Sequence, residues 1–90
     1  MKIEFDPDKR QKTLDERGLD FLDAAEIFDG TERTVPDMRF EYPEPRNLTY
    51  GLLRNRLVAL VWTRIDGGIR VISMRKANER EQASCRREMD

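Results

Sequence analysis

The run RLVALVWTRIDGGIRVISMR, at residues 56–75, constrains the fold more than any other part of the chain. Residues 56–63 are almost wholly apolar, which is typical of a central β-strand. The Asp66-Gly67 pair that follows is the signal of a tight hairpin, so residues 69–75 should return as an antiparallel neighbour. Simple alternation along that second strand places Ile69, Val71 and Ser73 on one face and Arg70, Ile72 and Met74 on the other. The rest of the chain must be arranged around this hairpin.

The first third of the chain predicts a short strand followed by two helices. Residues 2–6 alternate between apolar and charged side chains, as a half-buried strand does. Asp6 and Pro7 fit the cap and first position of a helix that runs to Arg17, and Gly18 fits its end. Asp20 can cap a second helix at residues 21–28. Its expected core face consists of Phe21, Leu22, Ala25 and Phe28.

The remaining two thirds predict strands and a final helix. Strands are expected at residues 38–42 and 46–53, separated by Pro43 and Pro45, in addition to the two strands of the hairpin. The last helix is expected to begin near Lys76 and to run to Met89. This order predicts an α+β fold in a single domain of residues 1–90, with two N-terminal helices, an antiparallel sheet of about four to five strands and a C-terminal helix.

Composition excludes several classes of chemistry. The chain has no histidine and one cysteine, Cys85, which excludes Ser-His-Asp catalysis and an intramolecular disulfide and argues against a zinc site. No metal or other cofactor is expected. No apolar run approaches the ~20 residues of a membrane span, and the N-terminus lacks the apolar stretch of a signal peptide. These features favour a cytoplasmic protein that does not contact a membrane.

Charge is divided unevenly along the chain. Residues 1–45 carry a net charge of −6 and residues 46–90 a net charge of +5, and nine of the ten cations in the second part are arginines. The planar guanidinium group can grip a phosphate with two hydrogen bonds. The uneven charge therefore favours contact with phosphate or nucleic acid, although a solvated surface of mixed charge is the alternative.

Four stretches of the chain resemble the BrnT family of bacterial toxins: EFDPDKR, ERGLDFLDAAEIF, VWT and ISMRKANERE. The resemblance implies a RelE-like fold and a ribonuclease that arrests translation as part of a type II toxin–antitoxin module. It also implies a BrnA-like antitoxin with a DNA-binding domain, whose complex with the toxin represses their operon. Many members read Lys-His-Gly where this chain has Glu16-Arg17-Gly18, and Tyr-Gly-Glu where it has Tyr42-Pro43-Glu44.

RNA cleavage without a metal needs a base for the 2′-hydroxyl, cations for the phosphorane and an acid for the leaving 5′-oxygen. Arg75 and Lys76 are the first candidate cations, because they lie between a strand and a helix, where backbone N–H groups also favour anions. The full set of candidate catalytic residues is Arg64, Arg75, Lys76, Glu44 and Glu79, and the candidate RNA-binding residues are Arg70, Tyr50 and Arg54. The alternative is that these are surface charges, and that Arg75 only fastens the last helix through a carboxylate.

The expected partners follow from the resemblance. They are a BrnA-like antitoxin and RNA, either free or as mRNA on the ribosome, with operator DNA contacted only through the antitoxin. A toxin dimer within a heterotetramer is left open. Two other functions also stay open: a non-catalytic module that binds nucleic acid or a partner, and a degenerate toxin that retains only its partner interface.

Overall fold

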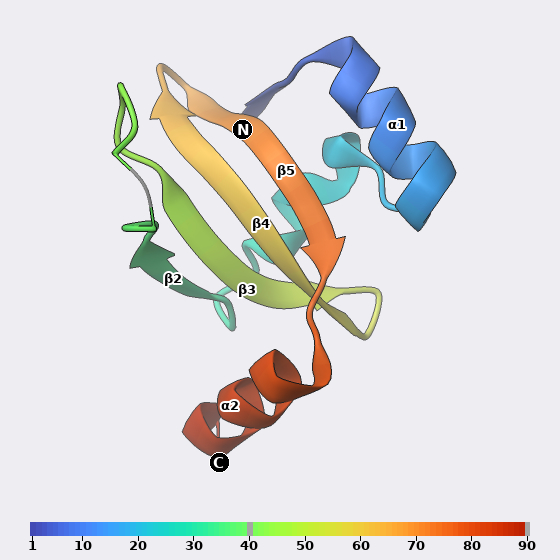
Figure 1. Ribbon diagram of the computed structural model, residues 1–90, viewed down its shortest axis with the longest axis vertical. Coiled ribbons are helices and arrows are strands. Elements are labelled where there is room, and N and C mark those ends of the chain that lie inside the picture. Colours follow the sequence, from blue (N-terminus) through green and yellow to red (C-terminus); the bar gives the residue numbers. More distant parts are fainter. Residues whose placement is uncertain (40, 90) are drawn as a thin grey trace.

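A five-stranded sheet, flanked by three helices, forms the centre of the computed structural model (Figure 1), which describes residues 1–39 and 41–89 and the side chains of residues 1–39 and 41–85. In chain order the elements are β1 (Lys2–Glu4), α1 (Pro7–Arg17), η1 (Phe21–Ile27), β2 (Arg33–Pro36), β3 (Asn47–Leu53), β4 (Arg56–Ile65), β5 (Gly68–Lys76) and α2 (Glu79–Met89). The strands lie in the order β1-β5-β4-β3-β2. The α+β class is therefore confirmed.

The sheet is mixed and not wholly antiparallel as predicted. Strands β2 to β5 pair antiparallel, but β1 pairs parallel with β5, with Lys2 opposite Gly68 and Glu4 opposite Arg70. Parallel pairing needs a long connection, and the whole body of the chain supplies it between these two strands. Gly68 permits the close approach of β1, because a Cβ atom there would collide with the backbone carbonyl of Lys2.

Helix α1 begins and ends where the sequence predicts. Asp6 accepts a hydrogen bond from the backbone N–H of Asp8, and Pro7 occupies the first turn. Gly18 ends the helix with a φ of 68°, a left-handed conformation that favours glycine. The helix lies beside β5 (Figure 1) and none of its residues is fully buried.

The second helix, η1, is a 3₁₀ helix, and this changes its buried face. Phe21, Ala24 and Ile27 are buried, whereas the predicted core residue Leu22 is 52% exposed. A 3₁₀ helix has three residues per turn, so every third side chain faces the sheet. Of the four predicted core residues, Ala25 is also exposed and Phe28 is half-buried; only Phe21 is fully buried.

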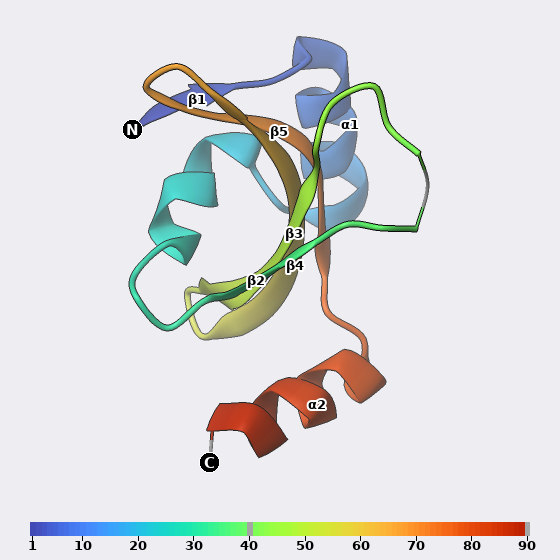
Figure 2. The same ribbon diagram turned by 90° about the vertical axis from the view of Figure 1, so that its left-hand side faces the viewer.

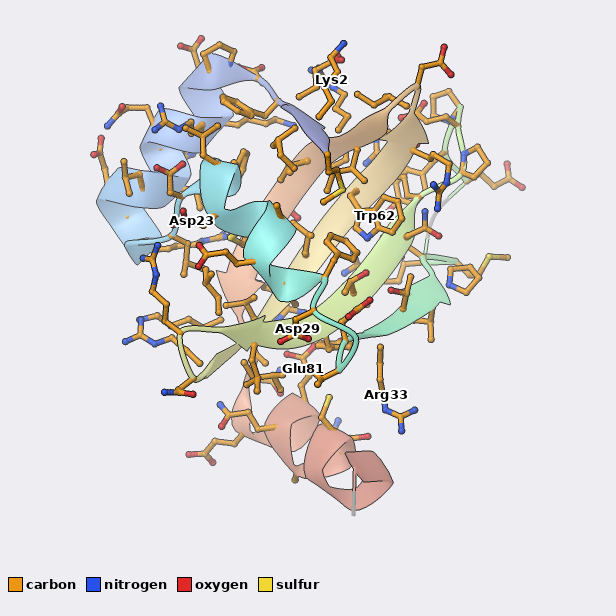
Figure 3. The ribbon with its side chains drawn as sticks, turned by 180° about the vertical axis from the view of Figure 1, so that it is seen from behind. Lys2, Asp23, Asp29, Arg33, Trp62 and Glu81 are labelled. Atoms are coloured by element: carbon orange, nitrogen blue, oxygen red, sulfur yellow. The ribbon has the colours of Figure 1, made fainter. Side chains whose placement is uncertain are left out.

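The core lies between η1 and one face of the sheet, here called the core face, and Figure 2 shows η1 on that side. Trp62 is 5% exposed, and its ring meets the ring of Phe28 edge-on with centroids 5.5 Å apart. Its indole N–H donates to the hydroxyl of Thr49 across 2.7 Å. Figure 3 shows this side chain beside the end of η1. The tryptophan therefore belongs to the core.

Strand β5 contains a bulge at Ile72. Val61 pairs with Ser73 and Trp62 pairs with Val71, so Ile72 has no partner on β4. One extra residue reverses the alternation of side chains beyond it. The simple alternation predicted for this strand is therefore wrong after Val71.

The bulge determines which side chains share a face. Met74 lies in the core together with Ile69 and Val71, instead of with Arg70. Ser73 and Arg75 consequently face the opposite side of the sheet, called the far face here. The bulge brings Arg75 to the same face as Arg70.

The strand predicted at residues 38–42 is also wrong for the described residues, and Phe40 lies outside them. Strand β2 forms earlier, and the described residues between Pro36 and Asn47 form no further strand before β3. Asp37 holds this loop, because its carboxylate accepts hydrogen bonds from the Arg39 guanidinium and, across 3.1 Å, from the Tyr42 hydroxyl. These local hydrogen bonds favour a bent chain over an extended one.

Helix α2 begins at Glu79, later than predicted, after Asn78 as its cap. It lies beyond the end of the sheet that carries the β3–β4 turn (Figure 2). Cys85, buried, faces the same small hollow as Leu52 and Leu57. Among the described helices, none is long and apolar enough to cross a bilayer.

Candidate nucleic-acid interface

One row of side chains crosses the far face near its α2 end. Tyr50 of β3 pairs with Ala59 of β4, and Ala59 pairs with Arg75 of β5. The row is possible because the Ala59 side chain is small, and the 1% exposure of Ala59 means that its neighbours cover it. Tyr50 and Arg75 reach over Ala59 to the same carboxylate, that of Glu81 in α2.

Glu81 joins this row to the helix. Its two oxygens accept hydrogen bonds from the two terminal nitrogens of Arg75, at 2.7 and 2.8 Å, and one accepts from the Tyr50 hydroxyl at 2.6 Å. Glu81 also forms a capping box with Asn78, in which each side chain accepts a hydrogen bond from the other residue's backbone N–H, at 2.8 and 2.9 Å. Figure 3 shows Glu81 between α2 and the end of the sheet.

The electrostatics of the row follow from these contacts. The Arg75 guanidinium holds the pKa of Glu81 down to about 2, so this carboxylate is ionised and is a very weak base. Burial and the bond to Glu81 raise the pKa of Tyr50 above its usual value, so the phenol keeps its proton at neutral pH. The bond to Glu81 also raises the pKa of Arg75. The row therefore holds a fixed cation and a protonated hydroxyl.

A cleft of about 400 Å³ adjoins the row and is lined by Glu16, Arg17, Arg75 and Lys76. Three of these four residues are cations. Arg17, at the end of α1, donates a hydrogen bond of 2.8 Å to the backbone carbonyl of Met74, which fixes it against β5. The structure thus brings Arg75 and Lys76 together with a third cation, in a position open to an anion.

The other predicted cations lie elsewhere. Arg64 lies over the Trp62 ring, 5.7 Å from its centroid, on the core face of β4 and so on the opposite side of the sheet from Arg75. Arg70 shares the far face with Arg75 but forms an ion pair of 2.8 Å with Glu4. Arg54 lies in the β3–β4 turn and forms ion pairs of 3.3 Å with two carboxylates of η1.

The two predicted bases are not part of the row. Glu44 lies in the loop between β2 and β3 and is 3.6 Å from Arg46. Glu79 is exposed in the first turn of α2. The carboxylate that meets Arg75 is Glu81, two residues further along. The role of every predicted residue in catalysis or RNA binding stays a prediction.

Comparison with known proteins identifies the family. The model of the BrnT ribonuclease toxins of type II toxin–antitoxin systems matches residues 5–81. The chain belongs to the BrnT family. The match includes α1, every strand of the sheet except β1, and the row of Tyr50, Arg75 and Glu81. No curated protein was found to match the chain.

Membership has two direct consequences for this BrnT protein. The members of the family are ribonuclease toxins, so the cleft with its three cations lies in a protein from a family that cleaves RNA. A type II system pairs its toxin with an antitoxin, so a protein partner is implied as well.

Sequence reasoning missed Glu81 and Arg17 as members of the site. The Asn78-Glu81 spacing is that of a capping box, and this signal places Glu81 at a helix start. The position of Arg17 in the cleft depends on how α1 lies against β5, which no local pattern specifies.

Proposed function

We propose that this BrnT-family protein is a metal-independent endoribonuclease that cleaves RNA at the cleft of Arg17, Arg75 and Lys76. The observation that carries the proposal is the convergence of these three cations, from two separate elements, beside a protonated tyrosine. A phosphorane carries more negative charge than the phosphodiester, so fixed cations stabilise it selectively. Because the chain has no histidine, arginine, lysine and tyrosine are the residues left to stabilise the phosphorane.

The residues of the site fit distinct parts of a transesterification. The RNA 2′-hydroxyl loses its proton to water and its oxygen attacks the adjacent phosphorus, the bond from phosphorus to the 5′-oxygen breaks, and that oxygen takes up a proton from water. Arg75 and Lys76 would contact the phosphate, and Tyr50, whose one O–H is bound to Glu81, would help to hold that carboxylate against Arg75. Glu81 is a positioning residue here, because its low pKa makes it a poor base and its contacts hold Arg75 and Tyr50 in place.

The wider function follows the family. We propose a RelE-like toxin that arrests translation by cutting mRNA, either free or on the ribosome. A BrnA-like antitoxin would neutralise it and carry the operator-binding domain through which the complex represses its own operon. The support is the family match over residues 5–81.

One observation favours a second candidate, a degenerate toxin that retains only its partner interface. Two nitrogens of Arg75 are already bound to Glu81, as expected of an arginine that only fastens α2. In that case wild type would leave RNA intact, and Arg75 would serve only to attach α2.

The test is cleavage of a defined RNA by purified, partner-free protein in the presence of EDTA. Wild type should cleave, and the Arg75→Ala, Lys76→Ala double variant should lose at least about 100-fold, because each oxyanion contact is worth about that much. Lys2→Ala combined with Arg56→Ala removes two exposed cations outside the cleft and serves as the matched control. Glu81→Gln breaks the same ion pair while keeping both cations, and so measures the effect of loosening α2 alone.

The outcomes separate the candidates. Loss in the cleft variant that exceeds the loss in Glu81→Gln supports the nuclease site. Equal losses in these two variants would mean that only the attachment of α2 matters. Intact RNA with every protein, both in buffer and in a reconstituted translation reaction, would refute the nuclease function and leave the degenerate toxin.

A further inference from the structure

A second hollow runs between α1 and β5 and joins the cleft. It has a volume of about 290 Å³, and Glu16 and Arg17 line both spaces. Together the two make one groove, called the α1–β5 groove here. The residues that line it are Lys9, Lys12, Thr13, Glu16, Arg17, Phe21, Ile72, Ser73, Arg75 and Lys76. Five of them are cations and one is a carboxylate.

The face that α1 turns to the groove has an unusual composition. Lys9, Lys12, Thr13 and Glu16 follow the spacing i, i+3, i+4, i+7, which in a helix packed on a sheet is normally apolar. Polar side chains at these positions keep α1 from closing onto β5. Neither lysine is within ion-pair distance of a carboxylate whose side chain the structure describes. The two charges are therefore available to a ligand.

The opposite wall is also open. Strand β1 pairs only with residues 68–70 of β5, so beyond Arg70 no described strand covers that edge. The bulge residue Ile72 and its neighbour Ser73 lie on this part of the strand and line the groove. Bulges are common next to active sites, where they redirect side chains.

We propose that the α1–β5 groove binds the phosphate backbone of single-stranded RNA and leads it to the cleft of Arg75 and Lys76. The inference rests on the proposed nuclease function and adds the path of the substrate. Lys9 and Arg17 are eight residues apart on α1, about 12 Å at 1.5 Å per residue. At about 3.4 Å per nucleotide along a stacked strand, this length holds roughly three phosphates.

The groove favours a single strand over other ligands of negative charge. Its cations lie in a line along a helix, which suits a regular polyanion and sequence-independent contact. Ile72 adds an apolar surface for a ribose or base. An acidic segment of the antitoxin is the competing occupant, and the experiment includes it.

The test measures binding of a fluorescent 2′-O-methyl oligoribonucleotide, which cannot be cleaved because its 2′-oxygen is blocked. Each phosphate contact on a single strand adds about 0.7 to the slope of log affinity against log salt. Lys9→Gln with Lys12→Gln should therefore lower the slope by about 1.4. From 50 to 200 mM salt, wild-type affinity should then fall about seven-fold more than that of the variant. Lys2→Gln with Arg56→Gln carries the same change of charge outside the groove and should leave the slope as in wild type.

A gain of affinity provides a check that misfolding cannot imitate. Glu16→Gln removes the one carboxylate that lines the groove, and RNA should bind this variant a few-fold more tightly. An unchanged slope in the lysine variant and unchanged affinity in Glu16→Gln would overturn the groove as the RNA path. Loss of neutralisation by the antitoxin without any change in RNA binding would assign the groove to the antitoxin and also overturn it.

The binding assay and the cleavage assay test the groove and the nuclease function separately. A wild-type protein that cleaves RNA, with lysine variants that bind like wild type, refutes the groove and leaves the nuclease function intact. A wild-type protein that never cleaves RNA refutes the nuclease function, whereas the change of slope in the lysine variants still reports the groove.

Discussion

Glu81→Gln should loosen α2 while leaving the sheet intact. The Arg75 ion pair is the main cause that lowers the pKa of Glu81 from 4.5 to about 2, with further lowering by Tyr50 and the backbone of Asn78, and a shift of this size corresponds to at most about 3.4 kcal/mol. Arg75 is 38% exposed and Glu81 16% exposed, so solvent screens part of this energy, and we expect about 1–2 kcal/mol. Glutamine can still accept hydrogen bonds in the capping box, so the substitution removes mainly the charge.

Hydrogen–deuterium exchange measures this loss element by element. A loss of 1.4 kcal/mol corresponds to ten-fold weaker protection, which we expect for the amides of α2 and not for those of β4. Glu79→Gln removes the same charge from an exposed position in the same turn and should cost no more than about 0.5 kcal/mol through the helix dipole. Equal effects of the two substitutions, or wild-type protection of α2 in Glu81→Gln, would refute the reasoning.

Three further predictions concern stability. Because the pKa of Glu81 is lowered in the folded protein, its contribution to the stability of α2 is complete above pH 4.5 and should be lost as pH falls toward 2. Hydrogen exchange of the α2 amides, measured as a function of pH, should show this loss in wild type and not in Glu81→Gln. Trp62→Phe removes the indole donor of the buried Thr49 hydroxyl, which keeps its hydrogen bond with the Thr34 hydroxyl, so the loss of one hydrogen bond should cost about 0.5–1.5 kcal/mol and lower the melting temperature by several degrees. Gly51→Ala places a methyl group against Ile27 of η1 and should cost about 1–3 kcal/mol by overpacking, measured by urea unfolding.

Local sequence signals predicted the parts of the fold that local physics controls. Both ends of α1 follow from Asp6, Pro7 and Gly18, since caps act through neighbouring backbone groups. The hairpin of β4 and β5 follows from Asp66-Gly67 for the same reason. The capping box of α2 was equally readable, and recognising Asn78-Glu81 would have placed the helix start correctly.

The parts that sequence reasoning missed depend on contacts between distant segments. Whether β1 pairs parallel or antiparallel is decided by the geometry of the whole chain, because the strand itself fits either arrangement. The bulge at Ile72 depends on how β5 pairs with β4, and no residue of β5 alone predicts it. The bulge nevertheless decides which face of the sheet Arg75 lies on. The sequence therefore predicted that Arg75 is a candidate cation at the end of a strand, but not that it lies in one row with Tyr50.

The far-face row and the cleft can operate together because arginine has more donors than its ion pair uses. The guanidinium of Arg75 carries five N–H groups, of which two bind Glu81 and a third makes a long contact of 3.4 Å with the carbonyl of Lys76. At least two donors remain for a phosphate in the cleft. The contact with Glu81 then acts as a support that fixes the plane of the guanidinium. In this arrangement the attachment of α2 and the binding of RNA do not compete, so the structural and functional roles of Arg75 are compatible in one conformation.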